Sequence, residues 1–447
     1  MSFPRYPEYK DSGVEWLGEV PAHWETIQSR RLFRERKDRA IEGDRQLTAS
    51  QKHGVIYQDD FMAIEGHKVM QVIHGADILK RAEPNDFVIS MRSFQGGIEW
   101  CGLVGSISSA YVMLIPGNSV VPGYFRYLFK SSRYIQALQS TTNLVRDGQA
   151  LRFANFILVD LPVVPEKEQT AIATFLDHET AKIDALVAEQ EKLIALLQEK
   201  RQAVISHAVT KGLNPNAPMR VSGVEWLGEV PAHWEVCALR RVIAAIEQGW
   251  SPECYARESE EQEWGVLKAG CLNGGVFRPS ENKALPPELS PEETYEVRAG
   301  DVLMSRASGS PELVGSTALV KATRERLMLS DKIFRLKLKG VVNAAFFVAA
   351  LNSRPLRIQI ENALSGGNGM ANNLPQSSLL TFVMAVPPRA EQATITVFLE
   401  QEAAKLDTLM TEARTAITLL QERRTALISA AVTGQIDVRN WSVSESA

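Results

Sequence analysis

Two arginines stand at matched places in the two halves of this 447-residue chain. Each follows a strand-like run, 86–90 or 301–305, and precedes a loop rich in serine and glycine: Arg92 precedes 93–97, and Arg306 precedes 307–310. Arginine can hold a phosphate or the edge of a guanine with two hydrogen bonds, and glycine lets the backbone come close to a partner. The pattern therefore predicts a nucleic-acid-reading loop in each half. A simple turn without a partner is the alternative interpretation.

Other polar residues of the same two regions join this candidate set. Polar loops, 140–152 and 365–373, follow segments that we expect to be short helices, Tyr124–Leu138 and Phe346–Ile360. The candidate DNA-binding residues are Lys52, Arg92, Ser93, Gln95, Arg152, Arg306, Ser308, Ser310 and Asn368. The segment 30–39 holds six basic residues interleaved with acidic ones. This indicates a solvated helix face, with phosphate contact as the alternative.

The chain is a tandem duplication. Residues 12–25 recur without change at 222–235, and 165–210 aligns without gaps on 388–433 with 24 identities in 46 positions. Self-similarity at a fixed period is typical of repeated structural units. The ends of the two units match while their middles differ, as expected of one scaffold that carries two different binding surfaces.

The matched segment of each unit predicts a long helix. Apolar residues recur at heptad spacing, flanked by Leu186, Leu193, Ile194, Leu409 and Ile417, as in a coiled-coil seam. About 40 residues would span roughly 60 Å at ~1.5 Å per residue, so the second helix must run back antiparallel to lie beside the first. The alternative is two separate amphipathic helices. The residues expected to pair the helices are Leu176, Ile183, Leu197, Val204, Leu399, Leu406, Leu420 and Leu427.

Composition and missing motifs exclude most enzyme classes. The net charge is −4, and Lys and Arg exceed Asp and Glu in the first variable region, 26–164, by 17 to 13. Phosphate-binding loops, dinucleotide fingerprints and paired metal ligands are absent from the sequence. The four cysteines have no metal-ligand spacing and are expected to be reduced thiols. With neither a signal pattern nor a long apolar run, the sequence predicts a cytoplasmic protein without a membrane contact.

The chain resembles the specificity subunits of type I restriction–modification systems. The resemblance rests on 9–21, on Val163–Gln169 and Val386–Gln392 before the two helices, and on 47–55 and 91–97 in the first variable region. It covers essentially the whole chain. The loop 306–315 is longer than the family's usual form.

The resemblance implies an α+β fold with two globular, mixed α/β target recognition domains. Two long antiparallel coiled-coil helices would join them in a pseudo-two-fold tandem repeat. The expected divisions are a first recognition domain (1–164), a first long helix (165–213), a linker with the second recognition domain (214–387), a second long helix (388–436) and a C-terminal tail (437–447).

The implied function is non-catalytic recognition of a bipartite, asymmetric site in double-stranded DNA. The implied partners are two methyltransferase subunits and two motor–nuclease subunits. Cofactors are expected only on these partners, as S-adenosylmethionine, ATP and Mg²⁺. Two alternatives remain: a coiled-coil adaptor that binds proteins rather than DNA, and a self-contained methyltransferase or nuclease.

Overall fold

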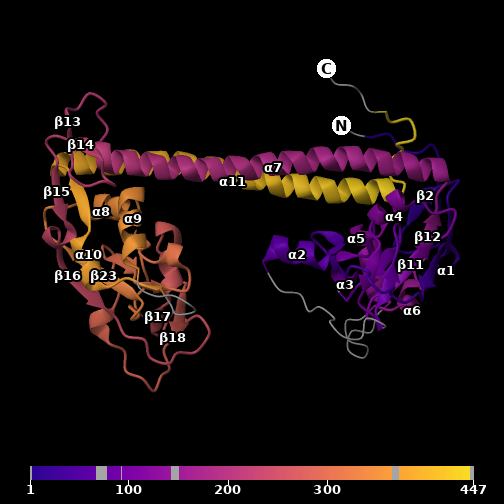
Figure 1. Cartoon of the computed structure of the whole chain (residues 1–447), viewed down its shortest axis with the longest axis horizontal. Helices are drawn as coiled ribbons and strands as arrows, with labels where there is room; N and C mark the ends of the chain where they lie inside the picture. Colours follow the sequence, from indigo (N-terminus) through magenta and orange to yellow (C-terminus); the bar gives the residue numbers. More distant parts are fainter. Residues whose placement is uncertain (1–2, 67–77, 92, 142–150, 365–371, 443–447) are drawn as a thin grey trace. The chain divides into compact units, whose positions relative to one another are not determined.

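A computed structural model of the chain describes residues 3–66, 78–91, 93–141, 151–364 and 372–442 (Figure 1). The chain forms two compact units. Unit 1 comprises 1–191 and 414–447, and unit 2 comprises 192–413. Each unit contains one mixed α/β region and part of each long helix, α7 (Glu166–Lys211) and α11 (Arg389–Val432). The units therefore cut across the linear divisions expected above, since each α/β region packs on both helices.

Unit 1 is built on a four-stranded antiparallel sheet in the order β4-β11-β8-β9. Four two-stranded ladders surround it, β1–β2, β3–β12, β5–β6 and β7–β10. The strands are β1 (Tyr9–Asp11), β2 (Glu19–Pro21), β3 (Glu25–Gln28), β4 (Phe33–Arg36), β5 (Leu47–Ser50), β6 (Gly54–Tyr57), β7 (Lys80–Ala82), β8 (Phe87–Ile89), β9 (Glu99–Trp100), β10 (Gly105–Ile107), β11 (Val112–Pro116) and β12 (Asp160–Val163). The helices are α1 (Ser29–Leu32), α2 (Gln58–Glu65), α3 (Ser93–Gly96), α4 (Pro122–Leu128), α5 (Ser132–Ser140) and α6 (Phe153–Phe156).

Unit 2 is built on a four-stranded sheet in the order β16-β23-β19-β21, beside a three-stranded sheet β18-β17-β22. Its strands are β13 (Met219–Val221), β14 (Glu229–Pro231), β15 (Glu235–Ala238), β16 (Ile243–Gln248), β17 (Gly265–Leu267), β18 (Asn282–Ala284), β19 (Val302–Ser305), β20 (Ala307–Ser308), β21 (Thr317–Leu319), β22 (Leu327–Met328), β23 (Ile333–Leu338), β24 (Asn372–Asn373) and β25 (Val383–Val386). The helices of the α/β region are α8 (Ala344–Leu351), α9 (Arg354–Ala363) and α10 (Gln376–Thr381).

The central sheets have the same topology. If the four strands of each sheet are numbered in chain order, their order across the sheet is 1-4-2-3, that is β4-β11-β8-β9 in unit 1 and β16-β23-β19-β21 in unit 2. The strand-like runs expected from the sequence become β8 and β19, which occupy equivalent places in the two sheets. The duplication therefore extends into the middles of the units, where the sequences have diverged.

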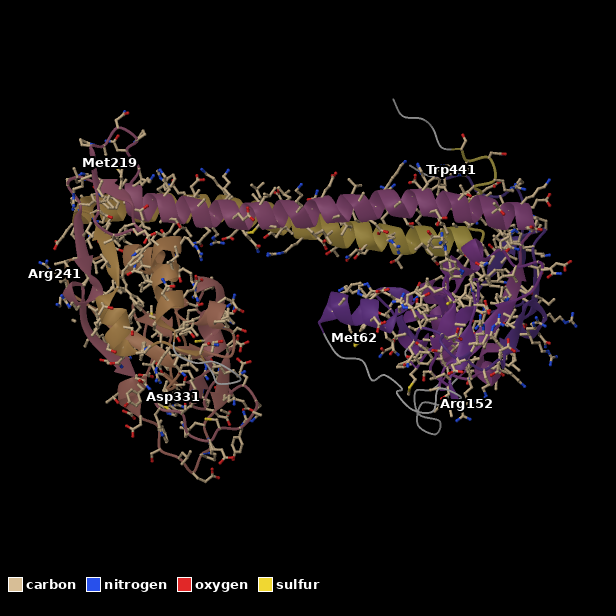
Figure 2. All side chains as sticks on the ribbon, in the orientation of Figure 1. Met62, Arg152, Met219, Arg241, Asp331 and Trp441 are labelled. Atoms are coloured by element: carbon tan, nitrogen blue, oxygen red, sulfur yellow. The ribbon has the colours of Figure 1, made fainter. Side chains whose placement is uncertain are left out.

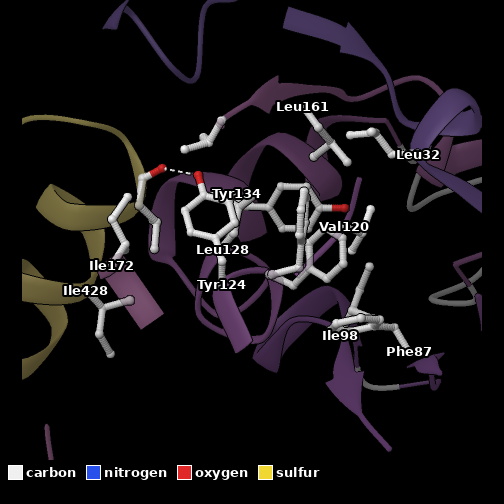
Figure 3. Close-up of a cluster of buried hydrophobic side chains, with 14 of the residues drawn as sticks. Leu32, Phe87, Ile98, Val120, Tyr124, Leu128, Tyr134, Leu161, Ile172 and Ile428 are labelled. Carbon is white, nitrogen blue, oxygen red and sulfur yellow. Dashed lines mark hydrogen bonds between the residues drawn. The ribbon is translucent and has the colours of Figure 1, made fainter. Parts of the chain in front are cut away.

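The core of unit 1 joins its α/β region to both long helices. Phe87 of the sheet, Tyr124 and Leu128 of α4, Ile172 of α7 and Ile428 of α11 belong to one buried cluster (Figure 3). The dashed line in Figure 3 is a hydrogen bond of 2.7 Å from the hydroxyl of Tyr124 to the carbonyl of Val432, the last residue of α11. Satisfying this buried hydroxyl matters because an unpaired polar group in such a core is costly.

The core of unit 2 follows the same plan. Phe346 of α8 and Phe334 of β23 are buried with Val209 of α7 and with Ile395 and Leu399 of α11. Each α/β region therefore rests on the start of one long helix and the end of the other.

The two helices pack antiparallel within each unit. In unit 2, Leu197 of α7 is buried with Leu406 and Met410 of α11. Leu176, Ile183, Leu399 and Leu427 are at most 8% exposed, whereas Val204 and Leu420 are half-buried. The flanking leucines Leu186, Leu193 and Leu409 are 42–46% exposed, so they do not widen the buried seam as the heptad pattern suggested.

A tryptophan clamp anchors each repeated N-terminal segment. In unit 1, Trp24 Nε1 donates to Glu168 Oε1 (2.9 Å), and His23 Nε2 lies 2.8 Å from Glu168 Oε2. In unit 2 the equivalent pair contacts Glu391: His233 Nε2 lies 2.9 Å from Glu391 Oε2, and Trp234 Nε1 donates to the same oxygen at 3.1 Å. The repeated histidines are thus part of a structural contact at the start of each long helix.

Two secondary-structure expectations are corrected. The basic segment 30–39 is not one continuous helix face. Only 30–32 are helical, in the four-residue helix α1, and 33–36 form β4 because this stretch pairs with β11 of the central sheet; there Arg36 pairs with Asp86 at 2.7 Å. The expected single helices are two helices each, α4 with α5 and α8 with α9, broken where Ser131 and Ser353 stand before the second helix.

Candidate nucleic-acid interface

In unit 1, a hairpin turn and the loop after β8 meet to form one surface. The hairpin is β5–β6, and its turn holds Gln51, Lys52 and His53. Gly96 of the loop lies against the side chain of Gln51, where an added Cβ would come within 2.6 Å. Two segments that are family-like in sequence and more than 40 residues apart are thus in contact. The loop expected at 93–97 is largely the short helix α3, and we use the name loop 93–97 for α3 together with Gly97. We call the turn and the loop 93–97 the hairpin–loop surface.

The basic side chains of the turn are held by one carboxylate. Lys52 Nζ donates to Glu65 Oε1 of α2 at 2.8 Å, and His53 Nε2 lies 2.7 Å from the same oxygen. These two hydrogen bonds, with His53 the larger contribution, lower the pKa of Glu65 to about 2. Lys52 is 72% exposed, so its ammonium can exchange a carboxylate for a phosphate.

Side chains of Lys130 and of α5 hydrogen-bond to the backbone of the loop 93–97. Lys130 Nζ donates to the carbonyl of Gly96 at 2.9 Å, and Gln139 donates to the carbonyl of Phe94. Gly97 has φ +80°, and a Cβ there would lie 2.1 Å from the carbonyl oxygen of Phe129, so only glycine fits. This support fixes the backbone without using the outward-facing side chains.

The sequence-predicted residues of the loop separate into structural and exposed ones. Ser93 is buried and its Oγ accepts a hydrogen bond from Ser90 N at 2.8 Å, which makes it part of the turn. Gln95 is exposed. Arg92 and Asn368 lie outside the described residues.

Arg152 lies elsewhere on unit 1. It is exposed at the start of α6, where its backbone N–H donates to Asn155 Oδ1 at 3.0 Å. It lies on the part of the unit that is remote from the long helices (Figure 2).

In unit 2, Arg306 follows β19 and is half-buried. Its Nη1 donates to the carbonyl of Asp331 at 3.2 Å, and its guanidinium lies 5.8 Å from the ring centre of Phe334. The side chain is therefore oriented by the protein while still partly exposed. Such pre-orientation lowers the entropy that a guanidinium loses on binding.

The residues after Arg306 form a short ladder. Ala307 and Ser308 make up β20, which pairs with β24 at Asn373 and Asn372. Ser308 Oγ accepts from Ser310 N at 3.2 Å. Both serines are half-buried.

A basic pocket lies beside Arg306, and sequence reasoning missed it. Its cavity is about 390 Å³ and is lined by Lys268, Lys283 and Lys332, together with Ser330 and Asp331. Asp331 lies away from the long helices (Figure 2). Lys332 lies 3.1 Å from Asp331 and Lys268 lies 3.6 Å from Glu281, a residue outside the pocket lining. The lysines come from three separate segments, so no local pattern could reveal them.

Two features of this pocket suit an anionic partner. The hydroxyl of Ser330 is buried and has no hydrogen-bond partner among the described residues. Burial raises the pKa of Asp331, but hydrogen bonds from Ser251 and Lys332 outweigh it and hold the pKa below its usual range. Three lysines therefore lie near two carboxylates, Asp331 in the pocket lining and Glu281 beside Lys268, and the remaining excess of positive charge attracts phosphate.

Within the described ranges there is no group of three or more His, Cys, Asp or Glu side chains that could hold a metal ion. Cys101, Cys237 and Cys271 are buried free thiols, and burial raises the pKa of Cys271 to about 12. Among the helices of the described part of the chain, none has the length and apolar character needed to cross a membrane.

Curated relatives of this chain are specificity subunits. No protein-family model matches the chain. It is 34% identical over 206 residues to the type I restriction enzyme EcoEI specificity subunit of Escherichia coli, an alignment that covers 46% of this chain and 34% of that protein. It is 24% identical over 373 residues to the EcoKI specificity subunit of E. coli K12, covering 80% of this chain and 76% of that one.

Solved structures show the same fold. A chain from a study of complex assembly in a type I R-M system superposes with a TM-score of 0.65 at 13% identity, covering 92% of this chain and 98% of that one. The HsdS subunit from Thermoanaerobacter tengcongensis gives a TM-score of 0.50 at 13% identity, over 93% and 98% of the two chains.

Proposed function

We propose that this chain is a member of the family of type I restriction–modification specificity subunits and is the DNA-recognition subunit of such a complex. The observation that carries the proposal is the pair of equivalent reading sites. The loop after β8 in unit 1 and the residues after β19 in unit 2 leave the same strand of the same sheet topology. Each stands beside a lysine, Lys52 in one unit and Lys332, whose carbonyl accepts from Arg306 N, in the other.

The two sites should read different DNA half-sites. Unit 1 offers a hairpin turn with Lys52 and the exposed amide of Gln95. Unit 2 offers an oriented guanidinium, Arg306, and a three-lysine pocket. Because the hydrogen-bonding groups differ, the base edges that complement them differ too. A bipartite, asymmetric target follows from two unlike surfaces in one chain.

We infer that the long helices bind the partner subunits of the complex. Two methyltransferase subunits would contact them, carrying S-adenosylmethionine, and two motor–nuclease subunits would carry ATP and Mg²⁺. The exposed leucines Leu186 and Leu409, which the duplication relates, support this role since exposed apolar side chains on a helix suit protein contacts. The chain itself would be non-catalytic.

A mobility-shift experiment tests DNA recognition against the protein-adaptor alternative. The full chain is titrated into pooled random duplexes with and without its methyltransferase subunit, at several salt concentrations. We expect salt-dependent binding that becomes sequence-selective in the complex. Absence of binding in both conditions would favour the adaptor.

Two further measurements complete the test. Sequencing methylated DNA from cells that express the complex should show a split motif with two unlike halves. Incubation of the chain alone with labelled S-adenosylmethionine and duplex DNA should give no methyl transfer. Incorporation without the partner would instead identify a self-contained methyltransferase.

A further inference from the structure

A cavity of about 640 Å³ opens in unit 2 between α8 and the two long helices. Its lining includes the charged residues Arg201, Glu312, Lys321, Arg357, Glu400 and Glu402 as well as apolar ones. The apolar wall is formed by Val204, Ile205, Val348, Ala349, Leu399 and Leu406. Cavities of this size hold small ligands or side chains of a partner.

The same place in unit 1 is filled by the chain itself. Ser131 and Ser353 are equivalent, since each donates its hydroxyl to the carbonyl three residues earlier, at 2.7 and 2.6 Å. Counting back from them, Arg126 and Tyr127 of α4 stand where Val348 and Ala349 stand in α8. Two large side chains of unit 1 are therefore small ones in unit 2.

In unit 1 the hydroxyl of Tyr127 contacts two side chains of α7. Its hydroxyl donates to Asp177 Oδ1 at 2.6 Å and lies 3.2 Å from Thr180 Oγ1. The guanidinium of Arg126 binds the same carboxylate. Burial raises the pKa of Tyr127, which keeps its hydroxyl a hydrogen-bond donor at neutral pH.

The duplication retains the acceptor in unit 2. Asp177 corresponds to Glu400 of α11, and Thr180 corresponds to Ala403, which lines the cavity. Glu400 holds Lys321 at 2.9 Å and is 56% exposed. A carboxylate has room for several hydrogen bonds, so Glu400 can accept a phenol as well.

We propose that this cavity binds a tyrosine side chain of the methyltransferase subunit, with Glu400 accepting its hydroxyl. The identity of the partner rests on the proposed function, whereas the phenol site rests on unit 2 alone. Charges of both signs beside an apolar wall, among them Lys321 and Glu400, are typical of a protein–protein contact. The occupant's chemistry is that of Tyr127 in the sister unit.

The first experiment measures the site without any partner. The probe is p-cresol, which has the tyrosine side chain's ring and hydroxyl, with toluene as the probe that lacks the hydroxyl. We expect p-cresol to bind the wild-type chain at least three-fold more tightly than toluene in ligand-observed NMR. Glu400→Ala should remove that preference, and Ala349→Tyr should abolish binding of both probes.

Two variants control this experiment. Ala390→Tyr adds a tyrosine to the exposed first turn of α11, away from the cavity, and should bind p-cresol as the wild type does. If Ala349→Tyr does not fold, Ala403→Tyr fills the cavity from the opposite wall. The proposed site is wrong if p-cresol does not bind the wild type. It is also wrong if a folded Ala349→Tyr or Ala403→Tyr variant binds p-cresol as tightly as the wild type does.

The second experiment identifies the occupant. Ala349→Tyr should weaken assembly with the methyltransferase subunit at least ten-fold, while the mobility shift of the chain alone on DNA stays unchanged. Normal assembly of a variant that has lost p-cresol binding overturns the partner assignment. Failure of the wild-type chain to assemble or to bind DNA would overturn the proposed function, whatever the p-cresol result.

Discussion

Arg424 of α11 donates to Asp184 of α7, with 2.9 Å between Nε and Oδ1. The duplication carries this pair onto Arg201 and Asp407, where Nη1 of the α7 arginine lies 2.7 Å from Oδ1 of the α11 aspartate. The first pair lies within unit 1 and the second within unit 2. Each helix thus supplies the arginine in one unit and the aspartate in the other, as antiparallel pairing of two equivalent helices requires.

The Arg201–Asp407 pair should contribute little to stability. Its side chains are 36% and 53% exposed, and solvent screens such pairs to about 0.2–1 kcal/mol. A double-mutant cycle with Arg201→Ala and Asp407→Ala, followed by urea unfolding, measures the coupling. We expect it to fall at high salt. A coupling above 2 kcal/mol would mean that the pair is far less solvated than its exposure indicates.

Arg306 should read one half-site. Arg306→Ala should weaken specific binding by roughly 1–3 kcal/mol at one half-site only, because a bidentate contact to guanine is lost. Arg306→Lys should lose the same discrimination, since an ammonium cannot present two parallel donors. Binding of duplexes mutated in either half-site measures this. We expect the same of Arg92 at the other half-site, and equal weakening on random DNA would make either residue a phosphate contact.

Lys283 should contact phosphate rather than bases. Lys283→Ala should weaken binding to all duplexes alike and reduce the slope of log K against log salt by about 1. The matched control is Lys200→Ala, an exposed lysine of α7, which should keep the wild-type slope. A change in sequence preference without a change in slope would show that the pocket reads bases.

The turn contact in unit 1 should be visible in a titration. Because His53 and Lys52 stabilise the charged carboxylate, the pKa of Glu65 is about 2. The contact therefore stabilises the folded state above the unfolded-state pKa of about 4.3, and this stabilisation is lost as the pH falls toward 2. NMR titration of His53→Ala and Lys52→Ala should show the pKa of Glu65 rising. Glu263, whose pKa of about 2 depends chiefly on Arg257, serves as the internal control and should not change.

The long helices should set the spacing of the half-sites. An insertion in α7 alone would move Asp184 and Arg201 farther apart along α7 while their partners on α11 keep their spacing, so one of the two ion pairs would break. One heptad is therefore inserted in each helix, after Glu191 in α7 and after Ala413 in α11. Each added heptad lengthens its helix by about 10 Å and keeps the apolar face in register. At ~34 Å per turn of DNA, this is about three base pairs.

Sequencing of methylated sites from wild-type and lengthened complexes measures that spacing. We expect the same two half-sites at a longer separation. Unchanged separation in a lengthened complex that still assembles would leave the helices as a surface for partners only.

The sequence by itself determined the local and repeated features. Heptad periodicity over some 40 residues predicts α7 and α11, because a helix is encoded by its own spacing of apolar residues. The runs at 86–90 and 301–305 predict β8 and β19 for the same reason. The two unchanged segments at 12–25 and 222–235 reveal the duplication, and the resemblance that they carry points to the family.

Tertiary structure alone decided which distant residues meet. Gln51 reaches Gly96, and Lys268, Lys283 and Lys332 line one pocket, although nothing in their spacing relates them. The exposure of Leu186 and Leu409 and the strand at 33–36 were likewise set by packing. Such contacts depend on how elements far apart in the chain fill space together, and a linear pattern records only each element's own periodicity.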